Sequence, residues 1–350
     1  MRTLYFNDSI KETLEQSISK DKSVIVMGLG VDDPKGVFGT TLNIHKKYKK
    51  NVFDLPTAEN SFTGIALGMS ISGFKPVIVH QRVEFSLLSI EQIYNQISKW
   101  FFMSGGKANV PMVIRLIIGK GWGQGPQHSQ SLEAIFSHIP GLKVVCPSNA
   151  YDAKGLLYSS IQDPDPVIFF EHRWLHSTKD YVPKKLFKVP LKKCKKINNG
   201  NDLTIISFSY PVLECMKAVE FLKKNNINCD LLDLRCLRPI DYNSILKSVR
   251  KTKKVLVVDN GWITNGISAE ILAYLSENLN LNKENYSFRR IGLKDAPIAS
   301  SVSISKYSYP EQPVIIKEVL KILNIKKNFK LIPKLRKNPD QPDSNFKGPF

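Results

Sequence analysis

A single glutamate stands at the start of an otherwise apolar segment of small residues. Glu59 lies within residues 56–70, and Gly64 and Gly68 follow it. The two glycines are four residues apart, so on a helix they share a face and let another backbone approach closely. Apolar surroundings disfavour the charged form of a carboxyl group, which suits a residue that exchanges a proton with a ring nitrogen. The residues alone also allow the alternative that Glu59 only favours the helix N-terminus.

A histidine follows a glycine-rich loop. Every second residue of 119–125 is a glycine, and His128 comes after an expected strand and before an expected helix. Ligands bind at the carboxyl ends of strands in parallel α/β sheets, which makes His128 a candidate site residue. Such a loop also suits a phosphate group, but it lacks the Gly-x-x-x-x-Gly-Lys-Ser/Thr pattern of a P-loop. The alternative is an ordinary loop histidine whose hydrogen bonds are satisfied.

Polar residues also follow the strand that is expected to start at Pro76. His80, Arg82 and Glu84 lie at the exit of this strand, and Phe85 comes next. The polar groups are site candidates because of their position. Phe85 by itself is interpreted as a core residue, since it opens an apolar pattern.

Two aspartates lie in a turn between an expected helix and an expected strand. Asp163 and Asp165 alternate with prolines, and the carbonyl groups at the end of the preceding helix are unsatisfied. Together these oxygens could bind a hard cation. The alternative is an ordinary proline-rich turn.

Short β-branched runs alternate with helical patterns along the chain. The runs expected to form strands are residues 23–27, 76–80, 112–117, 142–146, 167–170, 203–208, 229–234, 255–259 and 287–291. The segments expected to form helices are residues 9–19, 61–72, 90–103, 151–161, 211–224, 242–249, 266–277 and 313–323. The strand runs are almost continuously apolar, as in strands covered on both faces, so the alternation predicts an α/β fold with parallel sheets.

The alternation stops at residues 177–202, which contain lysine pairs, prolines and an Asn-Asn-Gly turn. We therefore expect a first domain at residues 1–185, a linker at 186–202 and a smaller α/β domain at 203–325. Residues 326–350 are basic and contain prolines, which is typical of a tail that cannot bury a core.

The chain has 350 residues and a formal net charge of +19. Its lysines lie along expected helix surfaces and in short stretches without interleaved aromatic residues, which argues against nucleic-acid binding. No apolar run is long enough for a membrane helix, and the N-terminus shows no targeting pattern, so we expect a cytoplasmic protein without a membrane partner. The five cysteines lie far apart and are expected to be buried thiols.

Together these segments resemble the β subunit of the E1 component of 2-oxo-acid dehydrogenase complexes, which act on pyruvate, branched-chain 2-oxo acids or acetoin. The segments that carry the resemblance are residues 56–68, 103–106, 127–130, 140–145, 152–156, 163–170, 233–241 and 266–271. The resemblance implies a parallel-sheet domain that binds the pyrimidine ring of thiamine diphosphate, followed by a transketolase C-terminal-like domain.

The resemblance also implies roles for individual residues. Glu59 corresponds to the glutamate that hydrogen-bonds N1′ of the pyrimidine ring, Phe85 to the aromatic residue that stacks on this ring, and His128 to the active-site histidine that stabilises or protonates the covalent intermediate. A K⁺ site, formed in part by main-chain oxygens, is implied as well. Its implied residues are Met112, Ser160, Ile161, Asp163 and Asp165.

The diphosphate and its Mg²⁺ need a separate site, which in this superfamily is a Gly-Asp-Gly followed later by Asn. The sequence contains no Gly-Asp-Gly, and Asp259-Asn260-Gly261 is not a substitute. The resemblance therefore implies that the cofactor lies between this chain and an α-type chain of an α2β2 heterotetramer, which holds Mg²⁺. It further implies decarboxylation of pyruvate or a related 2-oxo acid and acyl transfer to the lipoyl group of an E2 acyltransferase.

Three segments depart from the family pattern. Leu29 and Gly30 stand where acidic residues are usual, residues 81–84 bring charge into an aromatic-rich segment, and Trp122 and Gln124 are atypical of the histidine loop. These departures affect residues near the cofactor, so they leave the substrate and the acyl acceptor open.

Two alternative functions follow from these departures. One is a split transketolase-like enzyme that passes a ketol or acyl unit to a non-lipoyl acceptor, with His80 and Arg82 binding a polar substrate. The other is a non-catalytic scaffold subunit, against which the presence of Glu59, Phe85 and His128 argues.

Overall fold

The computed structural model describes residues 2–120, 123–306, 308–326, 332–343 and 346. These residues form two compact units. Unit 1 comprises the described residues of 1–119, 135–191 and 344–350, and unit 2 comprises those of 120–134 and 192–343.

Unit 1 is built on a parallel sheet. Its strands are ordered β6 (Lys143–Val145), β7 (Val167–His172), β5 (Val113–Ile118), β4 (Lys75–His80), β2 (Val24–Gly28) and β3 (Val52–Asp54). Every residue of β2, β5 and β7 is buried, as expected for strands covered by helices on both faces. The predicted parallel arrangement is therefore confirmed.

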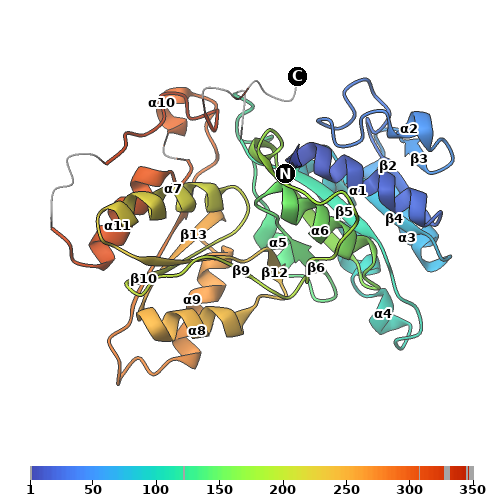
Figure 1. Ribbon diagram of the computed structural model, residues 1–350. Helices are drawn as coiled ribbons and strands as arrows, with labels where there is room; N and C mark the ends of the chain where they lie inside the picture. Colours follow the sequence, from blue (N-terminus) through green and yellow to red (C-terminus); the bar gives the residue numbers. More distant parts are fainter. Residues whose placement is uncertain (1, 121–122, 307, 327–331, 344–345, 347–350) are drawn as a thin grey trace. The chain divides into compact units, whose positions relative to one another are not determined.

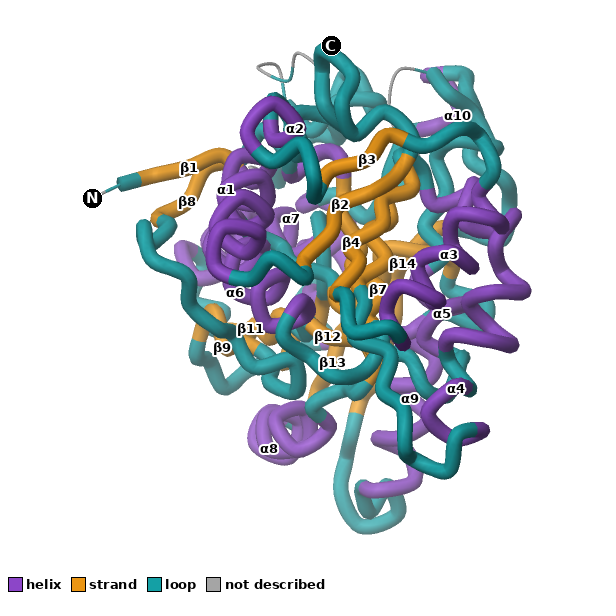
Figure 2. The backbone as a smooth tube through the Cα atoms, turned by 90° about the vertical axis from the view of Figure 1, so that its right-hand side faces the viewer, coloured by secondary structure: helices purple, strands orange, loops and turns teal. Residues whose placement is uncertain are grey.

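Helices cover both faces of this sheet. Figure 2 shows α1 (Phe6–Lys20) and α6 (Ala150–Ile161) on one side of β2 and β4, and α3 (Glu59–Ile71) on the other. A short antiparallel pair, β1 (Thr3–Tyr5) with β8 (Lys179–Tyr181), was not predicted. The remaining short elements are α2 (Ile44–Lys47), η1 (Val83–Ser89), η3 (Arg173–Leu175) and α5 (Glu133–Ser137), of which α5 begins in unit 2.

The prediction of one continuous α-helix over residues 90–103 is wrong. The segment contains the π-helix η2 (Gln92–Ile97) and then α4 (Trp100–Met103). The N–H of Ser98 donates to Ile93 O at 3.2 Å, five residues back, and the hydroxyl of Ser98 donates to Tyr94 O at 2.7 Å. A serine that bonds back to the preceding turn disturbs the regular α-helical pattern.

Unit 2 contains a second, mixed sheet. Its strands are ordered β14 (Ser287–Leu293), β13 (Lys254–Trp262), β10 (Leu203–Ser207), β11 (Cys229–Asp233) and β9 (Lys195–Asn198), and β9 is antiparallel to β11. Figure 1 shows α7 (Pro211–Lys224) and α11 (Gln312–Ile322) on one face, and α8 (Tyr242–Thr252) and α9 (Ile267–Asn278) on the other. The apolar core includes Leu222, Leu231, Val258 and Ile316. Unit 2 also contains β12 (Cys236–Arg238) and α10 (Val302–Ser305).

The predicted strands of both sheets are confirmed, with ends that differ from the expected ones by no more than three residues. Three segments differ from the expected organisation. Part of the expected linker forms the edge strand β9, residues 120–134 group with unit 2, and residues 332–343 of the expected tail also belong to unit 2. Among the described residues, no helix combines the length and the apolar character needed to cross a membrane.

Candidate functional site

Glu59 is the first residue of α3, and its side chain lies within unit 1. Only 6% of Glu59 is exposed. Among the described residues, no hydrogen-bond donor or cation pairs with its carboxylate. A helix N-terminus favours a negative charge. The oxygens of the Glu59 carboxylate nevertheless remain able to accept hydrogen bonds. Glu59 is therefore available to a ligand.

His80 ends β4 and packs against α3. Its ring centroid lies 5.1 Å from that of Phe62, which is one helical turn beyond Glu59. Both ring nitrogens of His80 are buried and have no hydrogen-bond partner among the described residues. Burial lowers the pKa of His80 to about 3, so the imidazole is neutral at pH 7.

Phe85 lies in η1, directly after β4. It is half-buried, and η1 contacts both α3 and β4. Partial burial lowers the pKa of Arg82, and the charge of Glu84 opposes this shift. Unit 1 thus brings the elements that carry Glu59, His80 and Phe85 into contact with one another.

The unusual Leu29-Gly30 segment packs against Gln81. The side-chain amide of Gln81 donates to Leu29 O at 2.8 Å. Gly30 has a φ of +74°, and a Cβ at this position would lie 2.2 Å from Gln81 Nε2. The positive φ favours glycine at this position, and Gln81 lies directly beside it.

His128 belongs to unit 2. It is half-buried, and the hydroxyl of Tyr309 bonds to the residues at both ends of the loop. This hydroxyl accepts the N–H of Lys120 at 2.9 Å and donates to Ser129 O at 3.5 Å. Trp122, which the sequence marks as atypical, lies outside the described residues, whereas Gln124 is described and half-buried.

A buried carboxyl group follows the histidine loop. Glu133 begins α5, and Asn260 donates to its Oε1 at 2.6 Å and to Ser131 Oγ at 3.2 Å. Burial raises the pKa of Glu133 to about 7, and the hydrogen bond from Asn260 opposes this rise. The neighbouring Asp259 is also buried, and its carboxylate accepts the N–H of Ser268 at 2.8 Å. Both carboxyl groups therefore already accept hydrogen bonds from other residues of unit 2.

A groove of about 570 Å³ lies beside the histidine loop within unit 2. Its lining residues are Pro126, Gln127, Gln130, Trp262, Thr264, Asp295, Ala296 and Pro297. Gln127 and Gln130 flank His128 in the sequence, so a molecule in this groove would lie next to the residues around that histidine.

The two aspartates of the expected cation site both form ion pairs with Lys143. Lys143 Nζ lies 2.5 Å from Asp163 and 2.9 Å from Asp165. Burial alone would lower the pKa of Lys143, but the two carboxylates hold it above its usual value. The main-chain oxygens of Met112 and Ser160 accept N–H groups at 3.0 and 3.2 Å, and a carbonyl oxygen can accept a second contact.

Ile161, the remaining residue of the implied K⁺ site, is the last residue of α6. Among the described residues, no group of three or more His, Cys, Asp or Glu side chains is arranged to hold a metal ion.

Several residues around the histidine loop were missed by the sequence reasoning. Tyr309, Glu133 and Asn260 come together with the loop only through the fold. Lys120 could have been recognised as a candidate from the sequence, because it is a charged residue within a glycine-rich run.

Comparison with known proteins agrees with this arrangement. Residues 3–177 match the family described as the transketolase pyrimidine-binding domain, and residues 192–312 match the transketolase C-terminal domain. A chain of a solved structure described as a split-gene transketolase, an inactive β4 tetramer, has a TM-score of 0.77 at 16% identity. It covers 93% of this chain and 99% of that one, and this likeness concerns the fold.

Curated relatives extend over most of the chain. The chain is 36% identical to the pyruvate dehydrogenase E1 component subunit beta of Porphyra purpurea, over 94% of this chain and 99% of the relative. It is 35% identical to the mitochondrial protein of the same name from Drosophila melanogaster, over 90% and 88%. It is also 36% identical to the acetoin:2,6-dichlorophenolindophenol oxidoreductase subunit beta of Cupriavidus necator, over 79% and 85%.

Proposed function

This chain belongs to the family of E1 β subunits of 2-oxo-acid dehydrogenases, which are thiamine-dependent oxidoreductases, and from this premise we propose its specific reaction. The proposed reaction is that of a pyruvate dehydrogenase of the acetyl-transferring type. In it, pyruvate or a related 2-oxo acid is decarboxylated and the lipoyl group of an E2 acyltransferase is reductively acylated. The chain would supply the pyrimidine-binding half of the active site.

The observation that carries this proposal is the buried, unpaired carboxylate of Glu59. A carboxyl group that is 6% exposed and has no partner among the described residues fits a ligand that brings its own hydrogen-bonding nitrogen. The N1′ atom of the pyrimidine ring is such a nitrogen. When bound, thiamine diphosphate supplies a nucleophilic thiazolium carbon and an electron sink for decarboxylation.

The other site residues have complementary tasks. Glu59 would hold and exchange the proton at N1′, a role worth roughly 10²–10⁴-fold in rate. The ring of Phe85 would pack on the pyrimidine face. His128 would move a proton at the oxygen of the substrate carbonyl during acyl transfer.

A partner chain is part of the proposal. The sequence has no Gly-Asp-Gly for the diphosphate and Mg²⁺, so an α-type chain would hold both in an α2β2 heterotetramer. Unit 1 exposes apolar side chains on α3, η1 and α4 that suit such a contact, and 87% of Phe102 is exposed. The others are Ile65, Ile71, Leu87, Leu88, Phe101 and Met103.

The acyl acceptor is proposed to be the lipoyl group of E2. The relatives named as pyruvate dehydrogenase subunits favour this acceptor over a split transketolase reaction, for which only the fold is similar. A lipoyl arm in the groove lined by Gln127, Gln130 and Trp262 would lie next to the residues that flank His128 in the sequence.

The substitution Glu59→Gln tests the proposal in the complex reconstituted with an α-type chain, thiamine diphosphate and Mg²⁺. Gln keeps the size of the side chain but cannot carry the proton, so we expect acylation of a lipoyl domain to fall about 10²–10⁴-fold while assembly is unchanged. Initial rates with pyruvate and size-exclusion chromatography measure the two effects.

Glu277→Gln is the matched control, because Glu277 is exposed in α9. This variant should retain the wild-type rate. A Glu59→Gln complex with near-normal turnover would refute the role of Glu59.

A further inference from the structure

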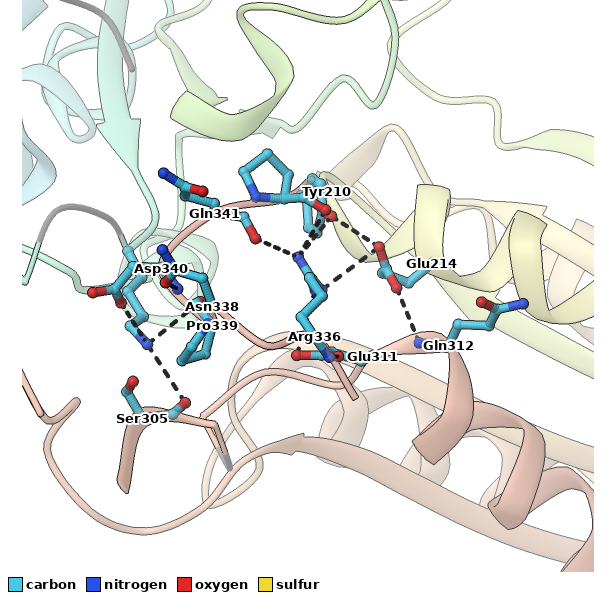
Figure 3. Close-up of polar contacts among 12 residues, drawn as sticks. Tyr210, Glu214, Ser305, Glu311, Gln312, Arg336, Asn338, Pro339, Asp340 and Gln341 are labelled. Atoms are coloured by element: carbon cyan, nitrogen blue, oxygen red, sulfur yellow. Dashed lines mark hydrogen bonds and ion pairs between the residues drawn. The ribbon is translucent and has the colours of Figure 1, made fainter. Parts of the chain in front are cut away.

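The C-terminal segment, residues 332–343, is anchored to unit 2 by Arg336. Arg336 pairs with Glu214 of α7 at 3.6 Å and with Glu311, just before α11, at 3.4 Å. It also donates to Gln341 O at 3.2 Å, so the segment folds back over its own anchor. Figure 3 shows Arg336 between the two glutamates, with Asp340 on the side away from Glu214.

Beyond this anchor, Asp340 reaches the glycine-rich loop. Its Oδ1 lies 2.8 Å from Nζ of Lys120, and its Oδ2 accepts the N–H of Gly123 at 3.1 Å. Nζ of Lys120 also lies 3.5 Å from the carbonyl oxygens of Ser305 and Pro339. Lys120 is 1% exposed, and among the described residues Asp340 is the only carboxylate within ion-pair distance of it.

Tyr309 links Lys120 to the residue that follows His128 in the same loop. The Tyr309 hydroxyl accepts the N–H of Lys120 at 2.9 Å and donates to the carbonyl oxygen of Ser129 at 3.5 Å. Ser129 directly follows His128 and is fully buried. A displacement of Lys120 would therefore be passed through Tyr309 to the residue next to the histidine.

An ammonium group with this little exposure is costly without a counter-charge. Removing one partner of a buried ion pair leaves the other charge unpaired and forces it toward water. Loss of the Asp340 carboxylate would therefore favour conformations of the loop in which Lys120 is more exposed. The position of the loop thus depends on a residue of the C-terminal segment.

We propose that Asp340 is a positioning residue for the active site and that the C-terminal segment fixes the loop that carries His128. This inference rests on the function proposed for His128 in acyl transfer. Asp340 does not touch the reacting atoms; it acts through Lys120 and Gly123.

The substitution Asp340→Asn tests this inference in the complete complex with the α-type chain, thiamine diphosphate and Mg²⁺. We expect kcat for acylation of a lipoyl domain to fall about 10- to 100-fold, because a small displacement of a catalytic group has effects of that size. KM for pyruvate and the affinity for thiamine diphosphate should change by less than about twofold, since Glu59 and Phe85 are unaffected.

A second readout does not depend on activity. Amide hydrogen exchange across residues 119–131 should become about tenfold faster in Asp340→Asn, because the loop loses a charged contact. In a His128→Ala background, Asp340→Asn should cause no additional loss of kcat, because its effect passes through His128.

Two further variants complete the design. Lys337→Gln is the control, since Lys337 is exposed in the same segment, and it should behave as wild type. Lys120→Met combined with Asp340→Asn leaves no buried charge unpaired, so it should recover most of the kcat and of the loop protection. If the complex with Asp340→Asn alone does not assemble, the double variant tests the inference instead. Failure of the double variant to assemble would then overturn the inference.

The outcomes separate this inference from the proposed function. Wild-type kcat and loop exchange in Asp340→Asn would overturn the positioning role of Asp340, and so would an undiminished effect in the His128→Ala background. If the wild-type complex acylates no lipoyl domain while loop exchange still rises in Asp340→Asn, the proposed function fails and the positioning contact stands.

Discussion

Glu59 and Glu133 are both buried carboxyl groups, but their surroundings assign them different tasks. Glu133 receives a hydrogen bond from Asn260 at 2.6 Å within unit 2, whereas Glu59 has no partner among the described residues of the chain. A buried polar group whose hydrogen bonds are made by the protein serves the fold. One that lacks them is available to a ligand, which is why Glu59 is the proposed cofactor contact.

Glu133 should give the folded chain a distinct pH dependence. Burial raises its pKa to about 7, whereas an unfolded glutamate titrates near pH 4.3. Between these values the folded chain retains a proton that the unfolded chain has released, so stability should fall as pH rises through this window and level off above it. The loss should be on the order of 3 kcal/mol.

Urea unfolding of the purified chain at pH 5, 6 and 7 measures this effect. In Glu133→Gln the decline between pH 5 and 7 should be smaller, because Gln does not titrate, whereas Glu277→Gln should keep the wild-type decline. Parallel pH profiles for wild type and Glu133→Gln would contradict the assignment.

At the scale of elements, a buried ion pair links the central strands of unit 1. Arg115 of β5 contacts Glu171 of β7 through two hydrogen bonds of 2.5 and 3.0 Å, and both side chains are fully buried. Arg115 also donates to Thr40 at 2.7 Å. Burial alone would raise the pKa of Glu171, but the charge of Arg115, followed by His176, holds it below its usual value.

Breaking this pair should destabilise the chain strongly. Arg115→Met or Glu171→Gln alone should cost roughly 3–5 kcal/mol, because a buried charge loses its partner. The double variant Arg115→Met/Glu171→Leu should cost less than the sum of the single changes. Chemical denaturation of the three variants measures this coupling, and strictly additive losses would argue against it.

We propose that the turn between α6 and β7 contributes to a K⁺ site. Asp163 and Asp165 are already paired with Lys143, so a cation would depend mainly on main-chain oxygens such as those of Met112 and Ser160. We expect KCl to raise the melting temperature of the complex by about 2–4 °C over choline chloride at equal ionic strength. Lys143→Met should enlarge the difference, because K⁺ would then replace the ammonium group.

Thermal melting in the two salts decides between the proposed site and an ordinary turn. Equal melting temperatures in KCl and choline chloride, for wild type and Lys143→Met alike, would show that this turn binds no cation.

At the scale of the whole molecule, the proposed site residues are divided between two units with separate sheets. Glu59 and Phe85 belong to unit 1, whereas His128 belongs to the loop in unit 2. Neither sheet carries, among the described residues, a cluster of acidic or imidazole side chains suited to Mg²⁺. Under the proposed function, the charged end of the cofactor would take its ligands from the partner chain.

The purified chain alone should bind thiamine diphosphate weakly. We expect its Kd to be about 100-fold or more above that of the complex, the equivalent of roughly 2.7 kcal/mol, because the diphosphate and Mg²⁺ contacts are missing. Titration calorimetry with and without Mg²⁺ measures this difference, and the α-type chain alone is the control. Tight, Mg²⁺-dependent binding by the lone chain would contradict a shared site.

The sequence determined the parallel strands, most of the helices and the family. Almost continuously apolar runs such as residues 112–117 and 167–170 indicate burial on both faces of a strand, and this information is local in the sequence. The position of Glu59 at the start of α3 was predictable for the same reason, since a carboxylate before an apolar run marks a helix N-terminus.

Only the tertiary structure decided which charged residues meet. Lys120 pairs with Asp340 and Glu133 bonds to Asn260, although more than a hundred residues separate the members of each pair. In a chain with 50 lysines and arginines, every carboxylate has many potential partners, and a local pattern cannot choose among them. The choice follows from burial, because a charge withdrawn from water is stable only beside a partner that the fold has placed there.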